Sequence, residues 1–117
     1  MDKRFAQTFA EEWIAAWNAH DIERILSHYE DEFELSSPAI TMLTGEPSGT
    51  LKGKKAIGEY WSGALQRYPE LKFTLQHILR GATSVTLIYE GVLGLSAEVF
   101  HFSPTGKVAK AFAHYDL

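Results

Sequence analysis

Hydrophobic residues near the N-terminus are spaced as on one face of an α-helix. From Phe5 to Trp17 they recur every three to four positions, and polar residues occupy the opposite face. Asp21 follows a break in this pattern and is suited to accept hydrogen bonds from the free N–H groups at the start of a second helix. The apolar stripe of that second helix runs from Ile22 to Tyr29. Because the connection is short, the two helices are predicted to form a hairpin.

The spacing of hydrophobic residues changes to two in the next segment. Phe33, Leu35 and Ser37 alternate with polar residues, which predicts a strand with one solvent-exposed face before Pro38. Glycine and proline are frequent from residue 38 to residue 53, so this segment is predicted to be a long loop or flap.

A third helix and four strands are predicted for the rest of the chain. Residues 57 to 68 carry an apolar helical stripe, and Pro69 ends the helix. The four strand segments are rich in β-branched and aromatic residues and are separated by turns that contain glycine: Leu71–Arg80, Thr83–Leu93, Leu95–Ser103 and Lys107–Leu117. This order predicts the α+β class, with three N-terminal helices on one face of an antiparallel sheet and one domain over residues 1–117.

Composition narrows the class of protein. The 117 residues are 45% hydrophobic and 22% charged, as in a globular domain, and the absence of cysteine excludes a disulfide scaffold, a thiol nucleophile and a cysteine zinc site. A net charge of −4 argues against nucleic-acid binding. No apolar run reaches the roughly 18 residues of a membrane span, and the N-terminus lacks the apolar region of a signal peptide. We therefore expect a soluble cytoplasmic protein that uses neither nucleic acid nor membrane as a partner.

Four stretches of the sequence resemble the nuclear transport factor 2-like superfamily, which includes SnoaL-like polyketide cyclases, ketosteroid isomerases and limonene epoxide hydrolases. They are Trp13–Asp21, Tyr29–Phe33 leading to Pro38, Leu51–Ile57 and Ala113–Asp116, which are spread over nearly the whole chain. The resemblance implies a strongly curved sheet that forms a cone with the helices, the cystatin-like roll, and a small apolar or cyclic ligand bound inside. This fold hosts many unrelated functions, so the resemblance does not name the reaction.

Glu98 is the candidate catalytic residue. Alternation along its predicted strand places it on the same face as Ser96, Phe100 and Phe102. Two phenylalanines on that face would desolvate the carboxyl group and raise its pKa, so that it could act as an acid or a base near neutral pH. The resemblance places Glu98 where ketosteroid isomerases carry a pocket carboxylic acid that donates to the developing oxyanion. The alternative is a glutamate on a wet strand face or bonded to a backbone group.

The other isomerase positions do not match. The family's general base is an aspartate immediately before the proline that ends the first strand, and this chain has Ser37 there. This chain has Trp13 at the position of the family's oxyanion tyrosine on the first helix, and Trp61 at the position of another pocket tyrosine. A third tyrosine of the family is matched by Tyr29. A serine hydroxyl does not accept a proton without an activating base, so efficient isomerisation of Δ5-3-ketosteroids is not expected. Ser37 could instead orient a ligand or cap the end of the strand.

Two orientations of the last strand would give different sites. Three alanines and Tyr115 share one face of this strand, and we place that face inside because small side chains leave room for a ligand. His114 and Asp116 then point outward. With the opposite register, His114 and Asp116 would form an alternative catalytic dyad.

No metal and no organic cofactor are predicted. His101, His114 and Asp116 could offer metal ligands, but their spacing fixes no complete set. The sequence has no glycine-rich phosphate loop and no zinc-protease helix motif. The last strand also lacks the arginine that an arrangement like that of limonene epoxide hydrolases would need.

The candidate walls of the pocket are mostly aromatic: Trp13, Trp17, Tyr29, Phe33, Ser37, Trp61, Phe100 and Tyr115. Three functions remain open: an enzyme that transfers a proton on a small apolar or cyclic substrate, a non-catalytic binding protein for such a ligand, and an accessory protein that uses the outer face of the sheet. The strands are apolar on both faces and the helices can cover only one. A homodimer through the outer sheet face is therefore expected.

Overall fold

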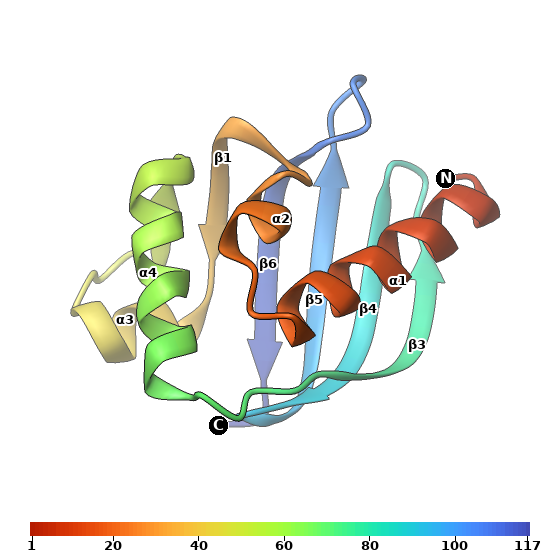
Figure 1. Ribbon diagram of the computed structural model, residues 1–117. Coiled ribbons are helices and arrows are strands. Elements are labelled where there is room, and N and C mark those ends of the chain that lie inside the picture. Colours follow the sequence, from red (N-terminus) through yellow and green to blue (C-terminus); the bar gives the residue numbers. More distant parts are fainter.

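The computed structural model describes residues 1–117 as one curled sheet with helices on its concave side (Figure 1). The helices are α1 (Lys3–Asn18), α2 (Ile22–Leu26), α3 (Pro38–Thr44) and α4 (Lys54–Arg67). The strands are β1 (Tyr29–Ser36), β2 (Thr50–Lys52), β3 (Thr74–Arg80), β4 (Ser84–Gly91), β5 (Gly94–Phe102) and β6 (Val108–Tyr115). The α+β class and the C-terminal strands are confirmed. No helix of the structure combines the length and the apolar character that a membrane crossing needs.

The six strands lie in the order β2-β1-β6-β5-β4-β3. Strands β3 to β6 form the predicted antiparallel meander. The expectation of a wholly antiparallel sheet is wrong, because β1 pairs with β6 in parallel. Two helices and four further strands separate β1 from β6 along the chain, so no tight turn dictates their relative direction. The second helix is also shorter than predicted, since Tyr29 already belongs to β1.

The segment predicted as a loop contains α3 and β2. Ser37 is the N-cap of α3, and its hydroxyl accepts the backbone N–H of Ala39 at 3.1 Å. Pro38 occupies the first turn, where its missing N–H costs nothing, and Gly45 ends the helix with a φ of 79°. The prediction treated proline and glycine only as breakers of structure, whereas in this segment they are the start and stop signals of a short helix.

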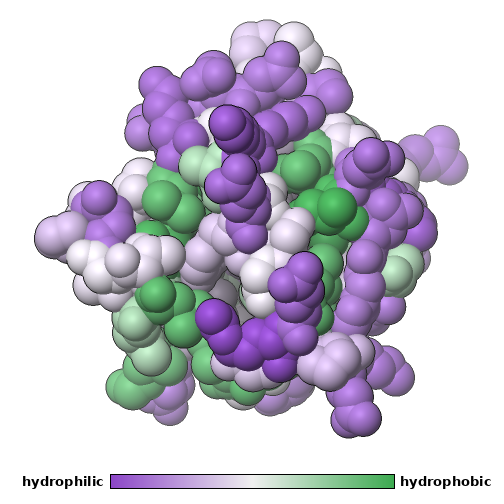
Figure 2. All heavy atoms as spheres, turned by 60° about the vertical axis from the view of Figure 1, so that its left-hand side comes forward, coloured by the Kyte–Doolittle hydropathy of each residue, from purple (hydrophilic) through white to green (hydrophobic).

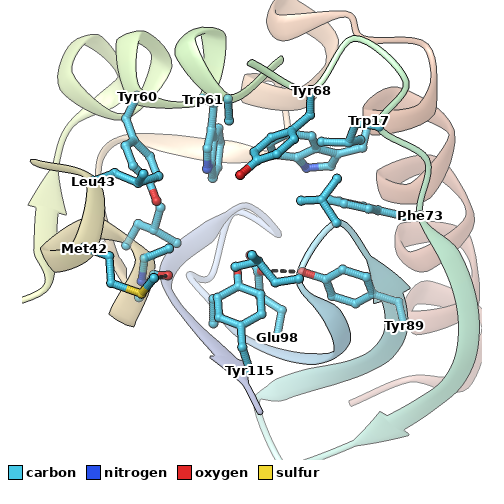
Figure 3. Close-up of a pocket in the computed structure, with 18 of the residues that line it drawn as sticks. Trp17, Met42, Leu43, Tyr60, Trp61, Tyr68, Phe73, Tyr89, Glu98 and Tyr115 are labelled. Atoms are coloured by element: carbon cyan, nitrogen blue, oxygen red, sulfur yellow. Dashed lines mark hydrogen bonds between the residues drawn. The ribbon is translucent and has the colours of Figure 1, made fainter. Parts of the chain in front are cut away.

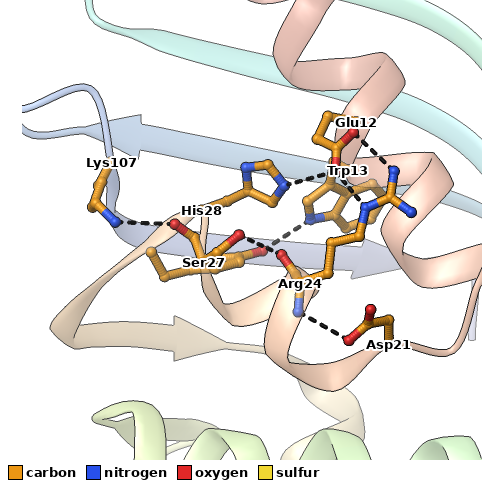
Figure 4. A network of polar contacts seen from close by, with 8 residues as sticks. Glu12, Trp13, Asp21, Arg24, Ser27, His28 and Lys107 are labelled. Carbon is orange, nitrogen blue, oxygen red and sulfur yellow. Dashed lines mark hydrogen bonds and ion pairs between the residues drawn. The ribbon is translucent and has the colours of Figure 1, made fainter.

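The two N-terminal helices form the predicted hairpin and are tied together by charged side chains (Figure 4). The Arg24 guanidinium donates to both carboxylate oxygens of Glu12, at 2.5 and 2.9 Å. Asp21 caps α2 by accepting the backbone N–H of Arg24 at 3.2 Å. His28 lies beside this pair, and its burial lowers its pKa although the nearby Glu12 carboxylate opposes the change.

Trp13 lies at the centre of the hydrophobic core and is 1% exposed. Its ring packs against Phe73 and Phe100, with centroids 5.5 and 5.3 Å away. Its indole N–H donates to the Tyr29 hydroxyl at 2.9 Å. Helix α1 is thereby fixed against both β1 and the meander, which places its C-terminal turn over the open end of the curled sheet.

Candidate functional site

A cavity of about 130 Å³ lies between the concave face of the sheet and the ends of α1, α3 and α4 (Figure 3). Nearly all of its walls are hydrophobic. The helices contribute Trp13, Trp17, Ala39, Met42, Leu43, Tyr60, Trp61 and Ala64, and the strands contribute Leu35, Tyr89, Glu98, Ala113 and Tyr115. An enclosed apolar space of about 150 Å³ is enough to bind benzene, so this cavity suits a ligand with a single ring.

Glu98 is the only buried charged residue of the protein, with 5% of its surface exposed. It lies in the middle of β5, between Leu87 of β4 and Ala113 of β6. The Tyr89 hydroxyl donates to its Oε1 atom at 3.2 Å, and no lysine or arginine forms an ion pair with it. Burial raises the pKa of Glu98 to about 7, although the Tyr89 hydrogen bond opposes this rise. At neutral pH the carboxyl group can therefore either accept or donate a proton.

Four tyrosines lie near enough to Glu98 for its charge to affect their pKa values. Burial and the charge of Glu98 raise the pKa values of Tyr29, Tyr60, Tyr89 and Tyr115, so all four remain protonated at neutral pH. Polar interaction with the Ser37 hydroxyl opposes the rise in the pKa of Tyr60 and of Tyr115. The cavity thus combines one carboxyl group that titrates near neutrality with neutral hydroxyl donors.

The rim of the cavity is also hydrophobic. Met42 and Leu43 of α3 are 63% and 45% exposed, and Val92 of the β4–β5 turn is 44% exposed. Figure 2 views the molecule from the side of α3 and α4, where hydrophobic patches interrupt a largely hydrophilic surface. An apolar ligand therefore meets apolar side chains at the entrance as well as inside.

The wall opposite α3 is held by hydrogen bonds to the end of α1. The Asn18 side chain accepts the backbone N–H of Phe73 at 2.7 Å and donates to the Phe73 carbonyl at 3.0 Å. A ring nitrogen of His20 bonds the carbonyl of Leu71 at 2.8 Å. Leu71 and Phe73 both line the cavity, so these bonds fix the segment that joins α4 to β3.

Five of the eight predicted pocket residues line the cavity: Trp13, Trp17, Ser37, Trp61 and Tyr115. Tyr29, Phe33 and Phe100 do not line it, since they are 0%, 1% and 0% exposed and belong to the packed core. The Tyr29 and Phe33 rings lie 4.3 Å apart, and Phe100 packs against Phe9 at 4.9 Å. The rings of these three residues are packed against other core side chains, so they leave no space for a ligand between them.

The orientation of β6 places Ala113 and Tyr115 at the cavity and leaves His114 and Asp116 exposed. The alternative dyad is therefore not formed inside the cavity. The structure also has no cluster of three or more histidine, aspartate or glutamate side chains that could hold a metal ion.

Several cavity residues were missed from the sequence. Tyr89, the hydrogen-bond partner of Glu98, alternates with buried Val85 and Leu87 along β4. Pairing β4 with β5 across their tight turn would have placed Tyr89 opposite Ser96, which makes it a diagonal neighbour of Glu98 on the same face. Met42 and Leu43 were missed because their segment was predicted to be a loop.

Comparison with known proteins places the molecule in one family. The model of the SnoaL-like domain matches residues 10–115. A SnoaL-like protein of unknown function from Burkholderia thailandensis E264 is 52% identical, with a TM-score of 0.97 over 99% of this chain and 98% of that one. No match was found among curated proteins.

More distant structures share the fold alone. A protein with a cystatin-like fold from Methylobium petroleophilum PM1 is 15% identical, with a TM-score of 0.79 over 100% of this chain and 79% of that one. A candidate isomerase of the SnoaL-like family from Agrobacterium tumefaciens C58 is 17% identical, with a TM-score of 0.76 over 97% of this chain and 99% of that one. The cystatin-like roll is therefore confirmed, and because the SnoaL-like model covers nearly the whole sequence, the chain belongs to the SnoaL-like domain family.

Proposed function

We propose that this protein binds a small apolar or cyclic molecule in the cavity and that Glu98 transfers a proton on it, in a reaction of the isomerase, cyclase or dehydratase type. One observation carries the proposal: a lone carboxyl group with a pKa of about 7 lies in an otherwise apolar cavity. A catalytic acid or base is most effective when its pKa is near the working pH. The candidate isomerase from Agrobacterium tumefaciens shares this fold, so the fold is compatible with the proposed reaction class.

The proposed chemistry uses both forms of the carboxyl group. Ionised Glu98 takes a proton from a carbon next to a carbonyl group, and the resulting neutral carboxyl group returns that proton to another atom of the same ligand. Tyr89 donates to Oε1 and holds the carboxyl group in place. The apolar walls exclude water, so the proton stays with the ligand.

The reaction of 3-cyclohexen-1-one to 2-cyclohexen-1-one tests this proposal, because the substrate has one ring and the product absorbs in the ultraviolet. We expect acceleration by the protein, with a rate that rises as Glu98 ionises around pH 7. Glu98→Gln should lower this rate about 10²-fold or more, which is the usual contribution of a general base. Glu70→Gln, which removes an exposed carboxyl group, is the control.

A second candidate function is non-catalytic binding of the same class of ligand, which the nearly complete hydrophobic lining favours. Tight binding of 2-cyclohexen-1-one together with no acceleration between pH 5 and pH 9 would support this function and overturn the catalytic one.

A full steroid is not expected to be a substrate. The cavity of about 130 Å³ is smaller than the roughly 300–1,000 Å³ of sites for drug-sized ligands, and the position of the isomerase base holds Ser37. With 5-androstene-3,17-dione we predict no isomerisation above the rate in buffer, followed by the absorbance of the conjugated product. Rapid isomerisation would show that a residue other than Ser37 supplies the base for the steroid and that the cavity widens to admit it.

We also propose that the protein is a homodimer through the outer face of the sheet. Ile88, Ala97, Val99 and Phe112 lie side by side there on three paired strands, and no helix covers them (Figure 1). A central apolar area on an uncovered sheet favours a second copy as its partner. Light scattering at micromolar concentration should give the dimer mass, and Val99→Lys should give a monomer. A monomeric mass for the unaltered protein would contradict this prediction.

A further inference from the structure

The wall of the cavity formed by α1 carries an indole N–H that has no partner. We propose that the Trp17 N–H is a ligand-binding donor, and that the ligand of this cavity carries a carbonyl oxygen which accepts it. This inference extends the proposed function by naming the residue that binds the carbonyl oxygen of the ligand. It rests on the proposed function only in taking this cavity as the ligand site.

Trp17 is 4% exposed, and its Nε1 atom is buried without a hydrogen-bond partner. Only one other buried side-chain atom shares this property, Nε2 of His28, which lies 3.9 Å from the Glu12 carboxylate and outside the cavity. Buried N–H groups in proteins are almost always bonded, so an exception calls for an explanation. Figure 3 shows the Trp17 nitrogen on the edge of the ring that faces the cavity.

The indole ring cannot turn to reach another acceptor because aromatic side chains hold it. The Trp61 ring meets it edge-on at 5.3 Å, the Phe73 ring lies tilted against it at 5.3 Å, and Trp13 lies 6.2 Å away. The side chain of Trp13, one turn earlier in α1, instead has its N–H satisfied by Tyr29. The same helix therefore presents one bonded indole to the core and one unbonded indole to the cavity.

Two backbone carbonyl groups of the α4–β3 segment, which forms the wall next to Trp17, already have hydrogen-bond partners. The Phe73 carbonyl accepts from the Asn18 amide, and the Leu71 carbonyl is bonded to the His20 ring. The other polar groups at the cavity are the Glu98 carboxyl group, which Tyr89 contacts, the Ser37 hydroxyl, which accepts from Ala39, and tyrosine hydroxyls. None of them is bonded to Nε1 of Trp17. A ligand that fills the cavity must therefore bring its own acceptor to Trp17, and a carbonyl oxygen provides one without an N–H or O–H that the apolar walls would leave unbonded.

A pair of ligands of equal shape tests this inference: cyclohexanone and methylenecyclohexane, in which a CH₂ group replaces the oxygen. Calorimetry should show that the unaltered protein binds cyclohexanone about fivefold more tightly, as expected for one neutral hydrogen bond. Trp17→Phe keeps a ring in place and should remove this preference while the affinity for methylenecyclohexane changes by less than about twofold. Trp61→Phe is the matched control at a second cavity tryptophan and should keep the preference.

A measurement on the unaltered protein covers the case in which Trp17→Phe does not fold. The indole ¹H–¹⁵N resonance of Trp17 should shift downfield with cyclohexanone and move little with methylenecyclohexane. Equal affinities for the two ligands, or loss of the preference in Trp61→Phe or Glu98→Gln instead of Trp17→Phe, would overturn the inference. Catalysis by Glu98 would still be decided by the cyclohexenone reaction, so the two proposals can fail separately.

Discussion

Replacement of Glu98 by glutamine is expected to stabilise the protein, and to do so more strongly as the pH rises. The pKa of Glu98 is about 7 in the folded state, against an ordinary value of 4.5 for a solvated glutamate in the unfolded chain. Between these values the folded state binds more protons than the unfolded state, so the free energy of unfolding falls as the pH rises through this range. A neutral amide has no such dependence, and its oxygen can still accept the Tyr89 hydrogen bond.

The size of this effect follows from the pKa difference. At pH 8 the variant should be more stable than the unaltered protein by about 3 kcal/mol, and at pH 5 by less than about 1 kcal/mol. Denaturant unfolding at both pH values measures the difference. His28 acts in the opposite sense, since its lowered pKa reduces stability at acidic pH, but it is present in both proteins and cancels in the comparison. An advantage that does not grow with pH would show that Glu98 is solvated.

Trp13→Ala is expected to have the largest effect on stability, a loss of about 3–5 kcal/mol. The substitution empties the space between Phe73, Phe100 and the end of α1, and it removes the donor to the Tyr29 hydroxyl. Leu79→Ala is the control, since Leu79 is 57% exposed and its truncation should change stability by less than about 1 kcal/mol. Thermal and denaturant unfolding measure both. A loss below about 1 kcal/mol for Trp13→Ala would place this ring outside the core.

The periodicity of hydrophobic residues predicts those parts of the structure that depend on residues close together in the sequence. The stripes of α1 and α4, the meander and the inward direction of Glu98 all follow from spacings of three to four or of two. The helix α3 was missed because Ser37 and Pro38 carry a capping signal that a count of glycine and proline hides. The parallel pairing of β1 with β6 was missed because no local pattern encodes it.

The cavity was predicted in its main residue but not in its extent. Alternation along β5 predicts that Phe100 and Glu98 share a face. It does not predict at which of these positions side chains from the helices fill the space above the sheet. The extent of the cavity depends on which side chains of α1 pack against each position of β5. Phe9 packs against Phe100 and leaves no space there, whereas Glu98 borders the cavity. The sequence does not predict the unbonded N–H of Trp17 either, because Trp13 and Trp17 lie on the same apolar stripe of α1 and differ in their hydrogen bonds.

The place of β6 in the sheet has a consequence for biosynthesis. This strand alone joins the β2–β1 pair to the β5–β4–β3 group, although it is the last of the six to be made. A nascent chain that stops short of β6 has two partial sheets, and the edges of β1 and β5 that face the gap are unpaired. Such open edges are sites of aggregation. The sheet closes only after synthesis has passed Tyr115, so ribosome-bound chains of this protein are candidates for chaperone protection until that point.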